Sequence, residues 1–192
     1  MQSICLLPHD PCWAREFVRE STIVAIAMGD ALLAIHHIGS TAIPGICAKP
    51  VIDILAVVRD VGVLDLLGVR MEALGYEVMG EFGIPGRRYF RKDDAIGTRT
   101  HQIHAFAEGS PQIARHVAFR DFLRAHPAHA VEYDALKQRL AALHPKDIGA
   151  YTDGKDAFIA EIDTLASGGI VSDIAGAILP ETGPVRLEPR VN

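Results

Sequence analysis

Eight consecutive residues, VIDILAVV at positions 51–58, constrain the fold of this chain more than any other segment. Aliphatic and β-branched side chains dominate the run, so it predicts a buried strand that is apolar on both faces. Asp53 interrupts this pattern. A carboxylate in such a strand is costly unless it is hydrogen-bonded, ion-paired or bound to a metal ion. A structural Asp satisfied by backbone amides, by Lys49 or by an arginine is the alternative to a functional one.

Composition limits the class of protein. Of the 192 residues 49% are hydrophobic, which is enough for a sizeable core. The net charge of −5 argues against general nucleic-acid binding, which needs a broad basic face, but leaves a local basic pocket open. The three cysteines lack Cys-x-x-Cys spacing, so neither a zinc site nor a disulfide framework is expected from them. With no signal peptide or membrane span apparent, we expect a soluble cytoplasmic protein.

The hydrophobic periodicity and the turn signals predict an α+β fold. The predicted helices cover 11–28, 60–74, 110–127, 128–143 and 150–166, and the predicted strands cover 33–38, 51–58, 76–79, 87–91 and 98–107. Ser110 is the expected N-cap of its helix, with Pro111 in the first helical position. Helices therefore gather in the C-terminal part, as in an α+β domain.

The chain divides into two parts by composition. Residues 1–165 carry the predicted elements and form the predicted domain. Residues 166–192 are rich in Gly and Pro and lack periodicity, so we expect an appendage that is disordered or docked onto a partner protein.

A turn of three small residues, Gly39, Ser40 and Thr41, precedes the buried strand. Glycine permits a tight turn, and consecutive amides and hydroxyls can wrap phosphate oxygens, with Lys49 adding a positive charge nearby. A hydroxyl-rich loop without function is the plain alternative for these residues alone. Twelve residues separate Ser40 from Asp53, and this combination of turn and strand carboxylate sharpens the prediction of a phosphate-handling site.

The segment HHIGSTAIPGICAKPVIDI, at 36–54, resembles the signature of the GrpB family within the nucleotidyltransferase superfamily. The resemblance covers about residues 8–165 and includes these further segments: DPCW at 10–13, RYFRK at 88–92, RTHQIHAF at 99–106, FRDFLRAHP at 119–127, YDALKQRLA at 133–141 and YTDGKDAFI at 151–159. It implies a nucleotidyltransferase-like mixed sheet with helices packed on it.

The resemblance also implies a chemistry. The superfamily transfers a nucleotidyl group from a nucleoside triphosphate to a hydroxyl, amine or phosphate with the help of Mg²⁺ or Mn²⁺, held by two or three carboxylates. Asp53 is then the metal ligand and a catalytic residue. Its partner acid is expected two residues later on the same strand face, where this chain has Leu55. A complete two-metal site is therefore not expected.

Histidines and basic residues complete the candidate site. His101 and His104 fall on opposite faces of their predicted strand, and one of them could replace the missing carboxylate as a metal ligand or act as a base. Hydrogen bonding to backbone is the plain alternative. The remaining candidates for phosphate binding, each otherwise a solvated surface charge, are Arg88, Arg91, Lys137 and Lys155.

Three functions fit these residues. The leading hypothesis is an enzyme that transfers a nucleotidyl group from a nucleoside triphosphate to a small-molecule acceptor in a metal-dependent reaction. The second is a non-catalytic module that binds nucleotide or phosphate. The third is a ligase-like enzyme that uses the same pocket with one metal ion.

Overall fold

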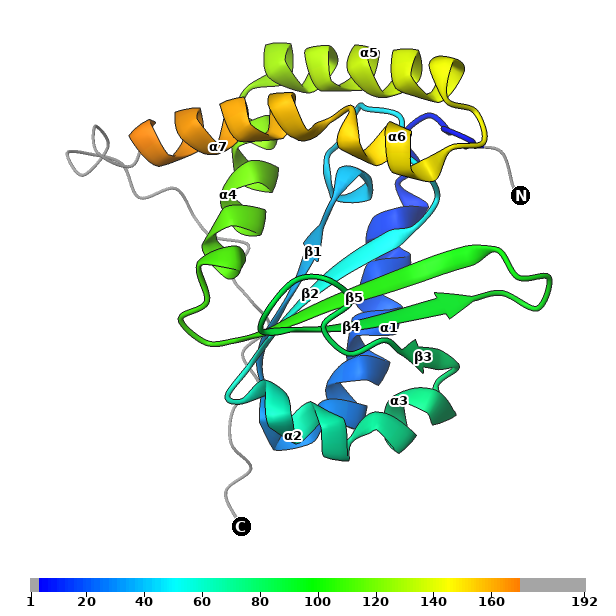
Figure 1. The fold of residues 1–192 in the computed structure, drawn as a ribbon, viewed down its shortest axis with the longest axis vertical. Coiled ribbons are helices and arrows are strands. Elements are labelled where there is room, and N and C mark those ends of the chain that lie inside the picture. The colour runs from blue at the N-terminus through cyan, green and yellow to red at the C-terminus, as the bar shows by residue number, and fades with distance from the viewer. Residues whose placement is uncertain (1–3, 170–192) are drawn as a thin grey trace.

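The computed structural model describes residues 4–169, which form a five-stranded sheet with helices on both faces (Figure 1). The strands are β1 (Leu32–Ile38), β2 (Ile52–Val58), β3 (Tyr76–Val78), β4 (Arg87–Asp93) and β5 (Arg99–Ala107). The helices are α1 (Cys12–Met28), α2 (Val61–Leu66), α3 (Gly68–Ala73), α4 (Pro111–Ala125), α5 (Pro127–Leu143), α6 (Ile148–Asp153) and α7 (Asp156–Gly169), with two single 3₁₀ turns, η1 (Gly29–Ala31) and η2 (Ser40–Ala42). The predicted α+β class and all five predicted strands are confirmed.

The sheet is mixed, with strand order β1-β2-β5-β4-β3. β2 and β5 are parallel neighbours at its centre, and the other neighbouring pairs are antiparallel. The register places Asp53 beside Gln102, and His104 beside Tyr89 of β4. Residues from three strands that are far apart in the sequence therefore meet on one area of the sheet.

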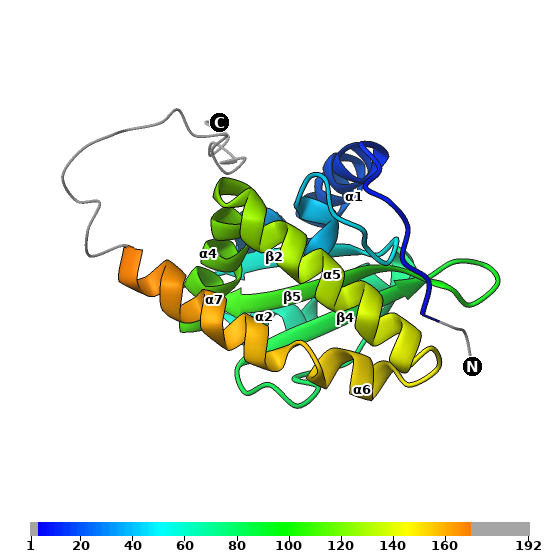
Figure 2. The ribbon, with the colours of Figure 1, turned by 90° about the horizontal axis from the view of Figure 1, so that it is seen from above.

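One face of the sheet packs against α1, α2 and α3. Alternate residues of β2, which are Ile52, Ile54, Ala56 and Val58, point into this core together with Ile103 and Ala105 of β5. The period of two sends Asp53 and Leu55 to the other face. Helices α4–α7 lie together on that side of the sheet (Figure 2), where smaller apolar clusters fill the space between them and the strands.

Two predicted helices are each broken into two. The predicted helix 60–74 is α2 and α3, separated at Leu67, whose ψ of 2° is not helical and which is followed by Gly68, a poor helix former. The predicted helix 150–166 is α6 and α7, separated at Gly154, where a Cβ would lie 2.5 Å from Leu140 Cδ2. The break lets α6 pack closely against α5.

The start of α4 and the end of α7 also differ from the sequence prediction. Ser110 precedes α4 in an extended conformation with Pro111 in the first turn, as predicted, but its side chain makes no capping hydrogen bond. Helix α7 continues past residue 165 to Gly169, and the rest of the predicted appendage, 170–192, lies outside the described residues. Within the described range, the helices are too short or too polar to cross a membrane.

Candidate functional site

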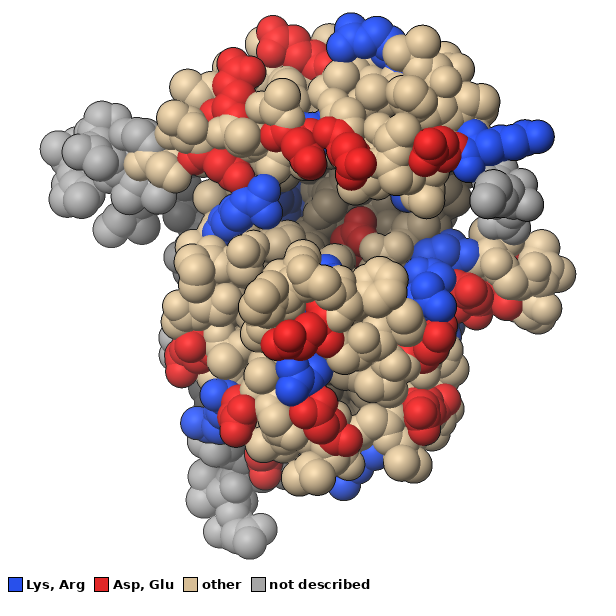
Figure 3. All heavy atoms as spheres, viewed as in Figure 1, with Lys and Arg blue, Asp and Glu red and all other residues tan. Residues whose placement is uncertain are grey.

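A pocket with a volume of about 550 Å³ lies on the sheet face that carries Asp53. Its walls come from η2, the ends of β2, β4 and β5, the segment 82–84, and helices α5 and α6. Figure 3 shows a hollow across this side of the molecule, with an acidic side chain inside it and basic side chains at its edges. The pocket therefore joins elements from both halves of the chain.

The Gly39 turn packs directly against the Asp53 carboxylate. Gly39 has φ of 70°, in the region that favours glycine, and a Cβ on it would lie only 2.3 Å from Asp53 Oδ2. The following residues close the 3₁₀ turn through hydrogen bonds from Ala42 N to Gly39 O and from Ile43 N to Ser40 O. The turn and the carboxylate, predicted separately from the sequence, form one continuous wall of the pocket.

A buried hydrogen-bond chain holds this turn in place. The Thr41 hydroxyl donates to Val51 O at 3.2 Å, so it accepts from His37 Nε2, which lies 3.0 Å away. Burial lowers the pKa of His37 to about 4, and the neutral ring stacks on Phe17. Thr41 thus lines the pocket with its hydroxyl already engaged, whereas Ser40 contacts the Tyr133 hydroxyl.

Two arginines of α4 bind the backbone on either side of the turn. Arg120 donates to His37 O at 3.0 Å, and Arg124 donates to Ala42 O at 2.8 Å. The site residues predicted from the sequence do not include His37, and they do not include Arg120 or Arg124, because charges on an amphipathic helix are typical of a solvated face. The only local signal was the adjacency of His37 to the Gly-Ser-Thr turn, because the arginines reach it through tertiary packing.

The surrounding protein removes most of the water around the Asp53 carboxylate, but the carboxylate stays open to the pocket. The Asp53 side chain keeps 27% of its exposure, toward the pocket. Loss of hydration raises its pKa to about 6, and the nearby ammonium groups of Lys49 and Lys155 oppose this rise. The same burial lowers the pKa of both lysines, that of Lys155 to about 8.

The two lysines share an aromatic neighbour. Lys155 Nζ lies 4.6 Å from the centre of the Tyr151 ring, and Lys49 Nζ lies 5.6 Å from it. Because Lys49 is in the loop before β2 and Lys155 follows α6, Tyr151 brings charges from opposite ends of the domain to one side of the pocket. Both had been predicted to bind phosphate, and both line the pocket.

His104 faces Asp53 from β5, with Nε2 4.0 Å from Oδ1. On its other side Arg87 Nη1 lies 3.2 Å from Nδ1. Because a guanidinium can only donate, Nδ1 accepts, and the proton of the neutral ring is on Nε2. Burial and the neighbouring His116 and Arg87 lower the pKa of His104 to about 3. His104 therefore presents an N–H to the carboxylate rather than the free lone pair of a base or a metal ligand.

Arg87 lines the pocket, although the predicted site residues include only its neighbours Arg88 and Arg91. It is buried, and its guanidinium also donates to the carbonyl oxygens of Glu81 and Phe82 at 3.2 and 2.7 Å. The salt bridges found among residues 4–169 do not include it. It thus brings a positive charge to the pocket wall and anchors the segment 81–86.

Four predicted site residues lie away from this pocket. His101 is on the opposite sheet face, as the alternation of its strand predicts. Arg88 binds Asp65 at 2.6 and 2.8 Å, and Arg91 binds Glu77 at 2.5 Å. Lys137 is buried, where it donates to Cys47 O and lies 3.6 Å from Asp134 Oδ1, so it fastens the loop before β2 to α5.

The second acid of a two-metal site has no substitute in this pocket. Leu55 occupies its strand position, is fully buried, and packs with Ile38 and Phe106. Asp53 is the one carboxylate among the described residues that line the pocket. This donor set fits one Mg²⁺ or Mn²⁺ ion that takes its other oxygens from a bound ligand and from water, and it does not fit two ions.

The mixed sheet with its Gly-Ser turn beside a strand carboxylate defines a nucleotidyltransferase-like fold. The fold is similar to that of terminal uridylyl transferase 4 from Trypanosoma brucei with bound dUTP, with a TM-score of 0.51 at 13% identity over 90% of this chain and 57% of that one. At this identity the likeness concerns the fold alone.

Residues 3–164 match the family described as GrpB protein, and the chain belongs to that family. It is 48% identical over 154 residues to the UPF0157 protein YqkA of Bacillus subtilis. This match covers 80% of the chain but only 44% of the length of YqkA. Among solved structures, conserved protein GrpB from Enterococcus faecalis matches with a TM-score of 0.82 and 40% identity, over 87% of this chain and 99% of that one. The resemblance read from the sequence is confirmed.

The Gly39–Asp53 contact predicts the effect of adding one methyl group. Gly39→Ala should destabilise the fold by more than Gly45→Ala, the matched control, in urea unfolding. Both residues have positive φ, which strains any residue with a Cβ, but only at Gly39 does the new Cβ meet a neighbour. The excess should shrink in an Asp53→Ala background, where Oδ2 is removed. Equal losses for the two glycines would contradict the contact.

The raised pKa of Asp53 predicts a pH-dependent free energy of unfolding. Between pH 3.8 and about 6 the folded protein binds more protons at Asp53 than the unfolded chain does, so Asp53 makes stability fall as pH rises through this window. Asp53→Asn removes the titration. The variant's stability relative to wild type should therefore rise by roughly 2–3 kcal/mol across the window, at 1.36 kcal/mol per pKa unit.

Urea unfolding on both sides of this window measures the difference. Asp30→Asn, at an exposed aspartate before β1, is the control and should show no such rise. A flat difference between Asp53→Asn and wild type would show that the Asp53 carboxylate is not desolvated.

Proposed function

We propose that the pocket binds the triphosphate of a nucleoside triphosphate together with one divalent metal ion on Asp53, and that the protein transfers the nucleotidyl group to a small-molecule acceptor. The observation that carries the proposal is the packing of the Gly39–Ser40 turn against Asp53. This contact puts the groups suited to phosphate and the group suited to metal on one wall. Membership of the GrpB family and the nucleotidyltransferase-like fold support it.

The charges in the pocket favour a polyanion that carries a cation. Lys49, Arg87 and Lys155 line it against the single carboxylate of Asp53, so the ionised pocket has a positive excess. A bound triphosphate would offset the burial that lowers the pKa of both lysines. Mg²⁺ commonly binds through one or two carboxylates plus substrate phosphates, which is the arrangement that one Asp allows.

Aromatic side chains offer a surface for the base. Phe82 stacks with Tyr89 at 5.3 Å between ring centres and is 55% exposed at the pocket, although it is apolar. Its φ of 44° is unusual for a residue other than glycine, and Arg87 holds its carbonyl oxygen in this conformation. An aromatic ring exposed at the pocket in this way is suited to stacking on a nucleobase.

The proposed reaction follows from these positions. An oxygen or nitrogen of the acceptor attacks the α-phosphorus and releases its proton to water. The bond from phosphorus to the α–β bridging oxygen breaks, and pyrophosphate leaves with that electron pair. The residues of the chain orient the triphosphate through the turn and hold its charge with Lys49, Arg87 and Lys155. When bound, the metal ion supplies Lewis-acid activation of the phosphoryl group. The N–H of His104 lies 4.0 Å from the Asp53 carboxylate, too far for a hydrogen bond, and turns the positive end of its dipole toward it.

A non-catalytic nucleotide-binding module is the second candidate, favoured by one observation. Leu55 removes the second acid, and its burial among Ile38 and Phe106 makes that position apolar, without a metal ligand. Such a module would keep the same turn, lysines and Asp53. The two candidates therefore predict the same binding and differ in whether pyrophosphate is released.

Calorimetric titration with ATP, CTP, GTP and UTP tests the binding. At least one should bind, with Mg²⁺ or Mn²⁺ strengthening it. Asp53→Asn should abolish the metal's effect, and Lys155→Met should weaken binding by about tenfold, equivalent to about 1.4 kcal/mol. Asp30→Asn and Lys146→Met, exposed residues outside the pocket lining, are the matched controls and should bind as wild type does. No binding of any nucleotide would contradict the proposal.

Incubation of the protein with the bound nucleotide and a pool of small metabolites tests the transfer. We expect pyrophosphate and a labelled nucleotidyl adduct from wild type and none from Asp53→Asn. Binding without any release of pyrophosphate would favour the non-catalytic module instead.

A further inference from the structure

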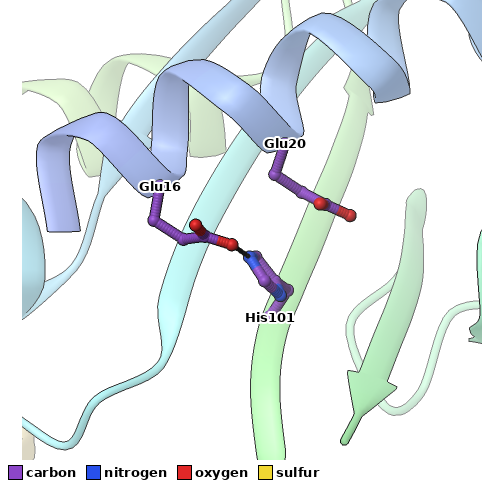
Figure 4. A group of neighbouring side chains, drawn as sticks. All are labelled: Glu16, Glu20 and His101. Carbon is purple, nitrogen blue, oxygen red and sulfur yellow. Dashed lines mark ion pairs between the residues drawn. The ribbon is translucent and has the colours of Figure 1, made fainter. Parts of the chain in front are cut away.

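A second cluster of chemically reactive side chains lies on the opposite face of the sheet. Glu16 and Glu20 stand one turn apart on α1, and His101 reaches toward them from β5 (Figure 4). One ligand atom of each lies within 4.8 Å of the others. Glu20 is 1% exposed and His101 is 5% exposed, so two of the three groups are buried. Nothing in the proposed nucleotide pocket uses them.

The hydrogen bonds around His101 fix which nitrogen carries its proton. The Thr100 hydroxyl donates to Lys92 O at 3.1 Å. Its oxygen lies 3.0 Å from His101 Nδ1, so it accepts a hydrogen bond from an Nδ1 proton. Burial lowers the pKa of His101 and keeps the ring neutral. The lone pair is then on Nε2, the nitrogen that faces Glu16.

That lone pair has no hydrogen-bond partner. Nε2 is buried and makes no hydrogen bond, and it lies 3.4 Å from Glu16 Oε1. A bare nitrogen lone pair facing carboxylate oxygens is electrostatically unfavourable unless a cation is shared between them. An orphaned buried atom aimed at two acids therefore indicates a site for a cation.

The groups that already bind Glu16 and Glu20 still allow both carboxylates to bind a metal ion. Lys92 Nζ and the Tyr76 hydroxyl both bind the same atom, Glu20 Oε1, at 2.8 and 3.0 Å. Arg19 binds both oxygens of Glu16 from the surface, so an ion must displace it there; its side chain is 66% exposed, which keeps the cost of displacement small. Glu16 and His101 also line an open pocket of about 370 Å³, which gives an ion a path to the cluster.

We propose that Glu16, Glu20 and His101 bind one divalent transition-metal ion, with Zn²⁺ preferred. One neutral imidazole nitrogen and two carboxylates suit Zn²⁺, whereas Mg²⁺ and Ca²⁺ prefer oxygen ligands alone. Thr100 serves as the outer partner that orients the ligating imidazole, a role commonly filled by a hydrogen bond to its other nitrogen. The ion would tie α1 to the central strand β5, so we expect it to stabilise the domain.

Equilibrium dialysis of the full chain with Zn²⁺ against a competing chelator tests the site. Wild type should bind one tightly held equivalent, and Glu16→Gln and His101→Gln should each lower that affinity at least tenfold. Three variants should match wild type: Glu132→Gln and His129→Gln on α5 as matched controls, and Asp53→Asn, which separates this site from the proposed nucleotide pocket. Circular dichroism of the metal-free variants checks their folding, and Glu16→Gln, at a half-buried residue, keeps the test valid if His101→Gln does not fold.

Two further readouts distinguish this site from adventitious binding. Co²⁺ should give visible bands without thiolate charge transfer, because Cys5, Cys12 and Cys47 lie outside the ligand set. Zn²⁺ should raise the melting temperature of wild type and not of His101→Gln, and excess Mg²⁺ should not compete. The proposal is overturned if wild type takes up no ion, as expected when a proton alone bridges His101 and Glu16. It is equally overturned if the Glu16 and His101 variants bind Zn²⁺ as wild type does.

Discussion

The close approach of Gly39 to Asp53 is the contact on which the pocket depends. A Cβ at position 39 would lie 2.3 Å from Oδ2, so any other residue there forces the Asp53 side chain to move. The positive φ of Gly39 separately favours glycine, and the pairing of Ile38 with Asp53 sets the carboxylate at the level of the turn. Phosphate-binding and metal-binding groups become neighbours through this single contact.

The rest of the domain holds that contact rigid. On one side, His37 and Thr41 tie the turn to Val51 and stack it against α1 through Phe17. On the other, Arg120 and Arg124 of α4 bind its carbonyl groups. A distant helix fastens the following loop, because Lys137 and Asp134 of α5 bind the backbone of Cys47. Helices that seemed in the sequence to be generic amphipathic elements thus act as supports of the turn.

The sequence predicted those features that depend on local pattern. Apolar runs located the five strands, and alternation correctly placed His101 and His104 on opposite faces of β5. The turn and Asp53 were identified through their spacing and the resemblance to the GrpB family. In contrast, periodicity does not record the close approach of Gly154 to Leu140 of α5, where the predicted helix 150–166 is interrupted.

Charges that act across the sheet could not be assigned from the sequence. Arg88 and Arg91 were predicted to bind phosphate, but tertiary contacts with Asp65 and Glu77 engage them, while Arg87 lines the pocket instead. The meeting of Glu16, Glu20 and His101 likewise joins α1 to β5 across more than eighty residues of chain. Alternation predicted the face of His101 but not the two acids that it finds there.

The most direct test of this account is a crystal structure of the chain with Mg²⁺ and an ATP analogue whose α–β bridge is a methylene group. The triphosphate should lie against Gly39 and Ser40, and Lys49, Arg87 and Lys155 should surround it. A single ion should lie on Asp53 and none beside Leu55. Phosphates bound elsewhere, or a second metal ion in the pocket, would contradict this account.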